Sequence, residues 1–216
     1  MRESTGSIGT RPSGGTDRPG RRSSRAGPWQ TPLRPSVVDP RGPLVSTPTG
    51  PDGLPSIAEY LAAAGVQVES VAPEAPGAPQ ISIPVPEGWQ QMNPAQFPGA
   101  YGVWATAPEG GWADNAVVLV AKFSEPMDSS KLLECGFTDA RRLPEWQELD
   151  THTGEFNGFP SSAITGTYVV APMTLWAYNR YVIVEDRYLV QLTVTTRADH
   201  DGADAAAIVA GLAVSA

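Results

Sequence analysis

Hydrophobic and polar residues follow regular patterns along most of the chain after residue 55. In residues 56–65, Ser56 is placed as an N-cap and Glu59 completes a capping box. The segment between is rich in Ala, and Gly65 follows it at the position where many helices end. This pattern predicts a short helix.

Strand patterns dominate the middle of the chain. Residues 81–85 alternate apolar and polar side chains but include Pro84, which places them at a sheet edge. An alternating segment and a long apolar run follow at 100–105 and 116–123, with a turn predicted between them over 108–114. Four further strands are predicted around residues 146–149, 162–169, 174–184 and 188–196. Their short loops, such as 184–187, favour antiparallel pairing.

Two more helices complete the predicted fold. Asp128 is placed to cap a helix containing Leu132 and Leu133, with a second helical turn toward Arg142. Residues 201–204 open a last helix that runs to Leu212. The order helix, strands, helix, strands, helix predicts an α+β fold, in which an antiparallel sheet is flanked by helices.

Composition separates the first 55 residues from this pattern. They hold 10 Pro and 9 Gly, and their apolar side chains are sparse and unpatterned. Such a segment buries too little surface to offset the roughly 1–2 kcal/mol per residue that ordering a backbone costs. We therefore expect residues 1–55 to form a disordered tail and residues 56–216 to form one globular domain.

Charge divides at the same place. The first 55 residues carry eight Arg, no Lys and four acids, whereas the remaining 161 carry seven basic residues and 19 acids. A basic tail is one pattern of nucleic-acid binding, but these Arg residues are spread among Pro, Gly and Ser without interleaved aromatic residues. The acidic body would also repel phosphate. We expect no nucleic-acid partner.

The sequence contains no evident membrane or export segment. No run approaches the roughly 20 apolar residues of a membrane span, and no apolar run follows Arg21 and Arg22 as an export signal requires. The sequence as written predicts a cytoplasmic protein. An alternative is that residues 1–44 are translated from DNA upstream of the real start, with Val45 as the initiation codon.

No familiar catalytic motif is present among those for nucleophilic serines, phosphate loops, dinucleotide sites or zinc proteases. His152 is predicted in a polar turn over 150–154. Asp199 and Asp201, which flank His200, are expected to cap the last helix, and the alternative is that they orient the His200 imidazole or bind a metal. Cys135 is interpreted as a small buried hydrophobe, and Ser161 and Ser162 as a strand start. We expect no enzymatic activity, metal or cofactor. A hydrolase with a hidden Ser or Cys nucleophile stays open as an alternative.

Aromatic residues are the remaining candidates for function. Trp176 and Tyr178 share one face of a predicted strand, with Arg180 beyond them on the same face. Trp112 lies in a glycine-rich loop, where a Trp has less reason to belong to a core. These four residues are the candidate contacts for a ligand or partner. The alternative is that the aromatic side chains fill a core or stack across strands.

Several segments resemble the LpqN/LpqT family of actinobacterial envelope proteins, which includes proline-rich secreted antigens. The resemblance covers roughly residues 56–214. It rests most strongly on Phe156-Asn157-Gly158-Phe159-Pro160-Ser161-Ser162-Ala163-Ile164-Thr165-Gly166-Thr167-Tyr168, and also on residues 56–61, 65–66, 81–89, 143–147 and 188–196.

This resemblance implies an α/β/α sandwich of the PsbP-like kind with a central antiparallel sheet. It also implies a lipoprotein-like or secreted protein of the cell envelope, without established catalytic residues. The implied function is a non-enzymatic binding or adaptor domain, whose partner is another protein or an apolar envelope ligand. A carrier of an apolar envelope lipid is the alternative. The sequence departs from the family in lacking a signal peptide and an N-terminal lipid-accepting Cys.

Overall fold

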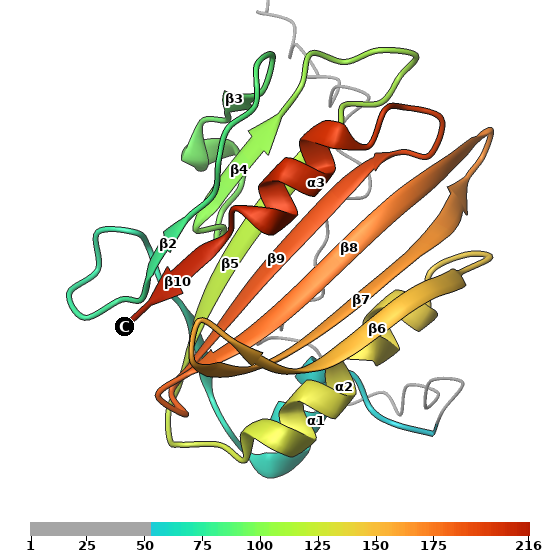
Figure 1. The fold of residues 1–216 in the computed structure, drawn as a ribbon. Helices are drawn as coiled ribbons and strands as arrows, with labels where there is room; N and C mark the ends of the chain where they lie inside the picture. The colour runs from blue at the N-terminus through green and yellow to red at the C-terminus, as the bar shows by residue number, and fades with distance from the viewer. Residues whose placement is uncertain (1–52) are drawn as a thin grey trace, which may run out of the picture.

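The computed structural model describes residues 53–216 and contains, within that range, three α-helices, one short 3-10 helix and ten strands (Figure 1). The predicted domain of residues 56–216 falls inside this range. The predictions of a disordered tail over residues 1–55 and of a start at Val45 concern residues that lie almost wholly outside it.

Eight strands form one antiparallel sheet. Seven of them follow the order β3-β4-β5-β9-β8-β7-β6, and β1 pairs with one end of β5. The strands are β1 (Val68–Ser70), β3 (Gln90–Gln91), β4 (Gly102–Ala105), β5 (Asn115–Phe123), β6 (Gln147–Phe156), β7 (Phe159–Val170), β8 (Met173–Val184) and β9 (Tyr188–Arg197).

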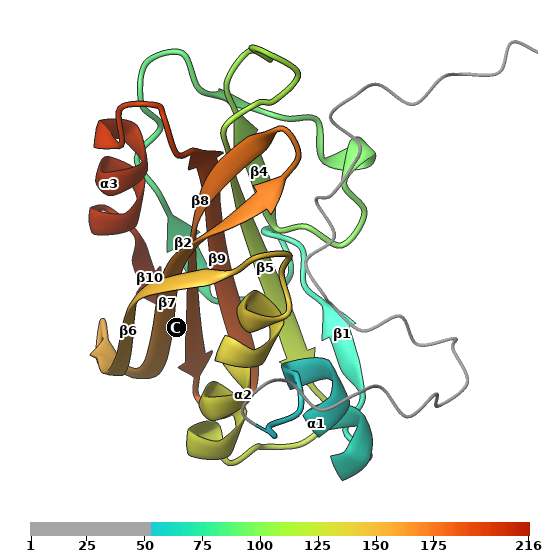
Figure 2. The ribbon, with the colours of Figure 1, turned by 90° about the vertical axis from the view of Figure 1, so that its right-hand side faces the viewer.

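Helices cover both faces of this sheet. Helices α1 (Ile57–Ala64) and α2 (Ser129–Arg141) lie on one side and α3 (Ala203–Ala210) on the other, as the two views in Figures 1 and 2 show. Beyond α3 the chain continues into β10 (Ala213–Ser215), which pairs with β2 (Gln80–Ser82) in a small second sheet. The predicted α/β/α sandwich with a central antiparallel sheet is therefore confirmed.

Local sequence signals explain the helix starts. Ser56 and Glu59 form the predicted capping box of α1, and Gly65 ends this helix with a φ of 74°. Asp128 accepts hydrogen bonds from two backbone amides at the start of α2. At the start of α3 the acceptor is Asp201, whose Oδ1 receives the Ala203 amide. Of the two acids beside His200 that were expected to cap this helix, Asp201 does so, from the position before the N-cap Gly202.

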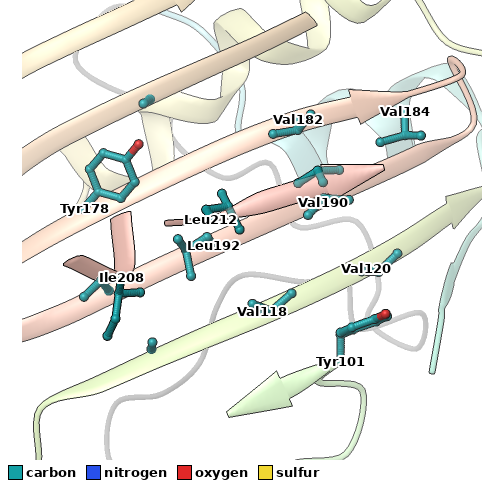
Figure 3. Close-up of a cluster of buried hydrophobic side chains, with 14 of the residues drawn as sticks. Tyr101, Val118, Val120, Tyr178, Val182, Val184, Val190, Leu192, Ile208 and Leu212 are labelled. Carbon is teal, nitrogen blue, oxygen red and sulfur yellow. The ribbon is translucent and has the colours of Figure 1, made fainter. Parts of the chain in front are cut away.

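Alternation along the strands directs apolar side chains to both faces of the sheet, where they form separate hydrophobic clusters, the two largest of which lie under the helices. One lies between the sheet and α3, and Figure 3 shows its valines from β5, β8 and β9 beside Ile208 of α3 and Leu212. The other lies beneath α1 and α2 and includes Leu61, Leu132 and Ile183. The strands β5, β8 and β9 are buried along most of their length, and β5 is a nearly continuous apolar run.

The structure corrects two predicted boundaries. Residues 150–154 form no turn but continue β6, so His152 lies on a strand that reaches Phe156. The chain then reverses at Asn157 and Gly158, whose positive φ values of 51° and 84° suit a tight hairpin turn. The last helix ends at Ala210 rather than Leu212, because the chain turns there into β10.

Candidate functional site

A groove of about 690 Å³ lies between α3 and the sheet, and three neighbouring strands form its floor. Trp176 of β8 lies opposite Thr167 of β7 and Thr196 of β9. Tyr178 faces the same side one step along β8, and Thr165 lies opposite it. The two aromatic rings stack with centroids 6.4 Å apart and planes 10° apart. The floor thus contains two nearly parallel aromatic rings bordered by threonines.

The walls of the groove are largely apolar. Figure 1 shows α3 over β9 and β5, whereas β8, β7 and β6 have no helix on that face. The residues that α3 turns toward the groove are mostly small: Ala205, Ala206, Val209 and Ala210. Leu149 of β6 lines the groove and is 61% exposed. Small helix residues leave the space unfilled, and an exposed leucine marks its outer rim.

A buried carboxylate holds the loop between β9 and α3, which closes one end of the groove. Asp114 accepts a hydrogen bond of 2.9 Å from the Arg197 amide through Oδ1. Its Oδ2 lies 2.7 Å from Nδ1 of His200, a residue of the groove lining. One side chain therefore fixes both the end of β9 and the approach to α3.

Arg180 lies beyond Tyr178 on the same face of β8. Its Nε donates to the Tyr178 hydroxyl at 2.6 Å, and its Nη1 donates to Oγ of Ser161 at 3.0 Å. The guanidinium carbon lies 4.3 Å from the ring centroid of Phe156, within the range of a cation–π contact. Three neutral side chains therefore hold the half-buried guanidinium in place.

Burial raises the pKa of Tyr178, and the neighbouring Arg180 charge and hydrogen bond only partly oppose this effect. The phenol therefore keeps its proton at neutral pH. Its oxygen accepts from Arg180, so the hydroxyl proton is still available for donation.

The structure brings Trp176, Tyr178 and Arg180 together and separates Trp112 from them. Trp112 is only 8% exposed and belongs to a cluster with Tyr168, Leu175 and Ala177. Leu175 and Ala177 occupy the face of β8 opposite to that of the groove residues. The expectation that a glycine-rich loop keeps Trp112 out of the core is wrong, because this loop folds its Trp onto the far face of the sheet.

The candidate nucleophiles have structural partners. Ser162 donates to the Leu133 carbonyl of α2 at 3.2 Å, and Ser161 accepts from Arg180. Cys135 is buried, and desolvation raises the pKa of its thiol to about 11, with smaller contributions from nearby acids. His152 is exposed on β6. Among residues 53–216, no three His, Cys, Asp or Glu side chains are grouped as metal ligands.

Comparison with known proteins identifies the family. The model of a family described as "Probable lipoprotein LpqN" matches residues 55–215, which is most of the chain. The chain belongs to the LpqN family. Its relatives include the lipoprotein LpqT of Mycobacterium tuberculosis H37Rv, 37% identical over 168 residues that cover 73% of each chain. The proline-rich 28 kDa antigen of the same strain is 33% identical over 186 residues, 81% of this chain and 60% of the antigen.

A solved structure of the LpqN family shares the fold. The crystal structure of LpqN from Mycobacterium tuberculosis superposes with a TM-score of 0.67. That protein is described as involved in cell envelope biogenesis. The match covers 76% of this chain and 99% of that chain, at 20% identity. The relatives are named as lipoproteins and antigens rather than as enzymes. Across residues 53–216, no helix is both long and apolar enough to span a bilayer.

Part of the groove could not be anticipated from the sequence. Strand alternation placed Trp176 and Tyr178 on one face, but nothing local showed that the alanines of α3 would face them. Thr165 and Thr167 share a face of β7 by the same alternation. Their position beside the aromatic floor depends on the pairing register of β7 and β8, which no short-range pattern specifies.

Proposed function

We propose that this protein is a non-enzymatic binding domain of the cell envelope, and that the groove between α3 and the sheet holds the apolar tail of a lipid. The observation that carries the proposal is the groove itself: about 690 Å³ with an aromatic floor and a wall of small apolar residues. This volume lies within the usual range of ligand sites, roughly 300–1,000 Å³. Membership of a lipoprotein family supports the location in the envelope.

The groove suits a chain of methylene groups better than a compact polar molecule. The half-buried Trp176 and the exposed Leu149 leave apolar surface in contact with water. Covering such surface stabilises a complex by roughly 25 cal/mol per Å². The threonines at the border add methyl groups and hydroxyls that pair readily with water when the groove is empty.

A protein partner has less support on the described surface. Only Val85 and Leu149 are large hydrophobic side chains that are strongly exposed among residues 53–216. A docking surface for another protein normally presents a wider apolar patch. Leu149 lies instead at the rim of the groove, where a lipid tail would cover it.

Catalysis also has less support than binding. Ser161 and Ser162 are fully buried, and neither hydrogen bonds with a histidine. The raised pKa of Cys135 keeps its thiol protonated at neutral pH, whereas a nucleophilic cysteine needs the thiolate. Ser161, Ser162 and Cys135 therefore have the burial and contacts expected of residues that stabilise the fold.

The proposal is tested by filling the groove. Ala206 lines it, whereas Ala207 is an exposed neighbour on α3 outside the lining. We expect Ala206→Trp to weaken binding of fluorescently labelled hexadecanol, an uncharged single-chain probe, by about tenfold or more, measured by fluorescence polarisation. Ala207→Trp is the matched control and should bind like the unmodified protein. Absence of binding by the unmodified protein, or equal binding by both variants, would overturn the proposal.

A further inference from the structure

Arg180 differs from the other arginines for which the structure describes ion pairs. Arg141 pairs with Glu148, Arg142 with Glu59 and Arg197 with Asp199. Within residues 53–216, no carboxylate lies within ion-pair distance of Arg180, whose hydrogen bonds go to the hydroxyls of Tyr178 and Ser161. A half-buried guanidinium with only neutral partners lacks the counter-charge that normally compensates its desolvation.

Hydrogen-bond donors remain unused on two side chains at this position. Nη2 of Arg180 has no hydrogen-bond partner within residues 53–216. The Tyr178 hydroxyl accepts from Arg180 Nε at 2.6 Å, and its own proton has no acceptor in the same range. Because Phe156 and Ser161 also contact the guanidinium, both donors are held in a fixed arrangement before any ligand arrives.

Tyr178 of this donor pair lines the groove, and Arg180 lies just beyond the lining. Trp176, Tyr178 and Arg180 follow one another on one face of β8, and the first two belong to the groove lining. A tail lying over Trp176 would therefore bring its head group to Arg180. The other charged groups that β6 carries on this face, Asp150 and His152, lie two strands away and are exposed.

We propose that Arg180 and Tyr178 bind the head group of a long-chain carboxylate whose tail lies in the groove. This inference rests on the proposed function and adds the class of head group. Nη2 of Arg180 and the Tyr178 hydroxyl can each donate a hydrogen bond to one oxygen of a carboxylate. The 19 acids against seven basic residues after residue 55 also favour a single negative charge over a double one.

The test compares palmitate with hexadecanol, two probes with the same chain length and different head groups. We expect the unmodified protein to bind palmitate at least tenfold more tightly at pH 8, measured by displacement of the labelled hexadecanol. Arg180→Gln should abolish this preference and leave hexadecanol affinity within about twofold. Tyr178→Phe, which removes only the hydroxyl, should reduce the preference, so the test does not depend on one variant folding.

Arg197→Gln is the matched control, because Arg197 also lines the groove but pairs with Asp199. It should keep the palmitate preference. Equal binding of palmitate and hexadecanol by the unmodified protein would overturn this inference and leave the proposed function standing. Loss of the preference in Arg197→Gln but not in Arg180→Gln or Tyr178→Phe would also overturn it. That result would mean that the head group binds beside Arg197, at the other end of the groove. If neither probe binds, the proposed function itself fails.

Discussion

Asp139 on α2 is a half-buried carboxyl group whose surroundings disfavour its charge. Desolvation raises its pKa to about 6, and the positive charge of Arg142 opposes this only in part because Arg142 is engaged with Glu59. The folded protein therefore holds the Asp139 proton more tightly than the unfolded chain, whose carboxyl has an ordinary pKa near 3.8. The resulting stabilisation is fully present below about pH 4 and is lost as the pH rises through about 6.

This sign gives a residue-scale prediction. Asp139→Asn should raise the free energy of unfolding at pH 7.5 by about 1–3 kcal/mol, because it removes a charge that is costly to bury. At pH 4 the two proteins should unfold at nearly the same urea concentration. Urea denaturation followed by circular dichroism across pH 4–8 measures both. A variant that is less stable at pH 7.5 would show that Asp139 is stabilised by its neighbours.

For single residues, the sequence predicted which face of a strand a side chain occupies better than it predicted which distant residues that side chain contacts. Alternation alone placed Trp176, Tyr178 and Arg180 on one face, and the structure has them there. Trp112 was misplaced and the contact of His200 was not foreseen, because both residues meet distant partners: Trp112 packs against β7 and β8, and His200 meets Asp114. A residue type reports what a side chain can do, whereas tertiary pairing decides what it meets.

At the scale of elements, the loop that leads into α3 is held by a side chain from outside it, Asp114. Asp114→Ala would leave the Arg197 amide without its acceptor and free His200. We expect a loss of about 1–3 kcal/mol in unfolding free energy. We also expect faster amide hydrogen exchange over residues 197–203 than in the unmodified protein.

Asp199→Ala is the matched control for this change. Asp199 lies in the same loop, is exposed, and pairs only with the side chain of Arg197. Its removal should leave exchange in the loop unchanged, because exposed ion pairs contribute little. Equal effects of the two alanine variants would mean that the loop is not held through Asp114.

The long buried strands were predictable, whereas the extent of β6 and the existence of β10 were not. β7, β8 and β9 carry apolar side chains at regular intervals, so their existence follows from pattern. β6 is exposed along nearly its whole length as the edge strand, and nothing in its hydropathy shows where it ends. β10 has three residues and pairs with β2, more than a hundred positions earlier, so local signals could not reveal it.

For the whole molecule, charge is the property that the sequence defines best. Residues 56–216 carry 19 acids and seven basic residues, so like-charge repulsion should weaken the fold when little salt is present. We expect the melting temperature at pH 7.5 to rise by roughly 2–4 °C between 10 mM and 150 mM sodium chloride. A constant or falling melting temperature would show that ion pairs such as Arg142 with Glu59 already compensate the acids locally.

The predicted order of elements was confirmed, because it depends on patterns that repeat over many residues. The sandwich architecture that the family resemblance implied was confirmed as well. The groove arises at a different level. The groove exists because α3 covers β9 and β5 but leaves the same face of β8, β7 and β6 without a helix. The position of α3 depends in turn on how Asp114 anchors the loop after β9. Hydrophobic patterns within single helices or strands do not specify where a helix lies across a sheet.

The position of α3 near the end of the chain means that the ribosome synthesises it after the strands of the large sheet. All eight strands of the large sheet precede it, so the sheet is complete before its cover exists. During that interval Val118, Leu192 and Val194, fully buried in the finished fold, have no helix over them. An unfinished chain therefore presents the kind of apolar strand surface that chaperones bind and that aggregates grow from. When α3 covers this face, it removes a surface prone to aggregation and also completes the groove.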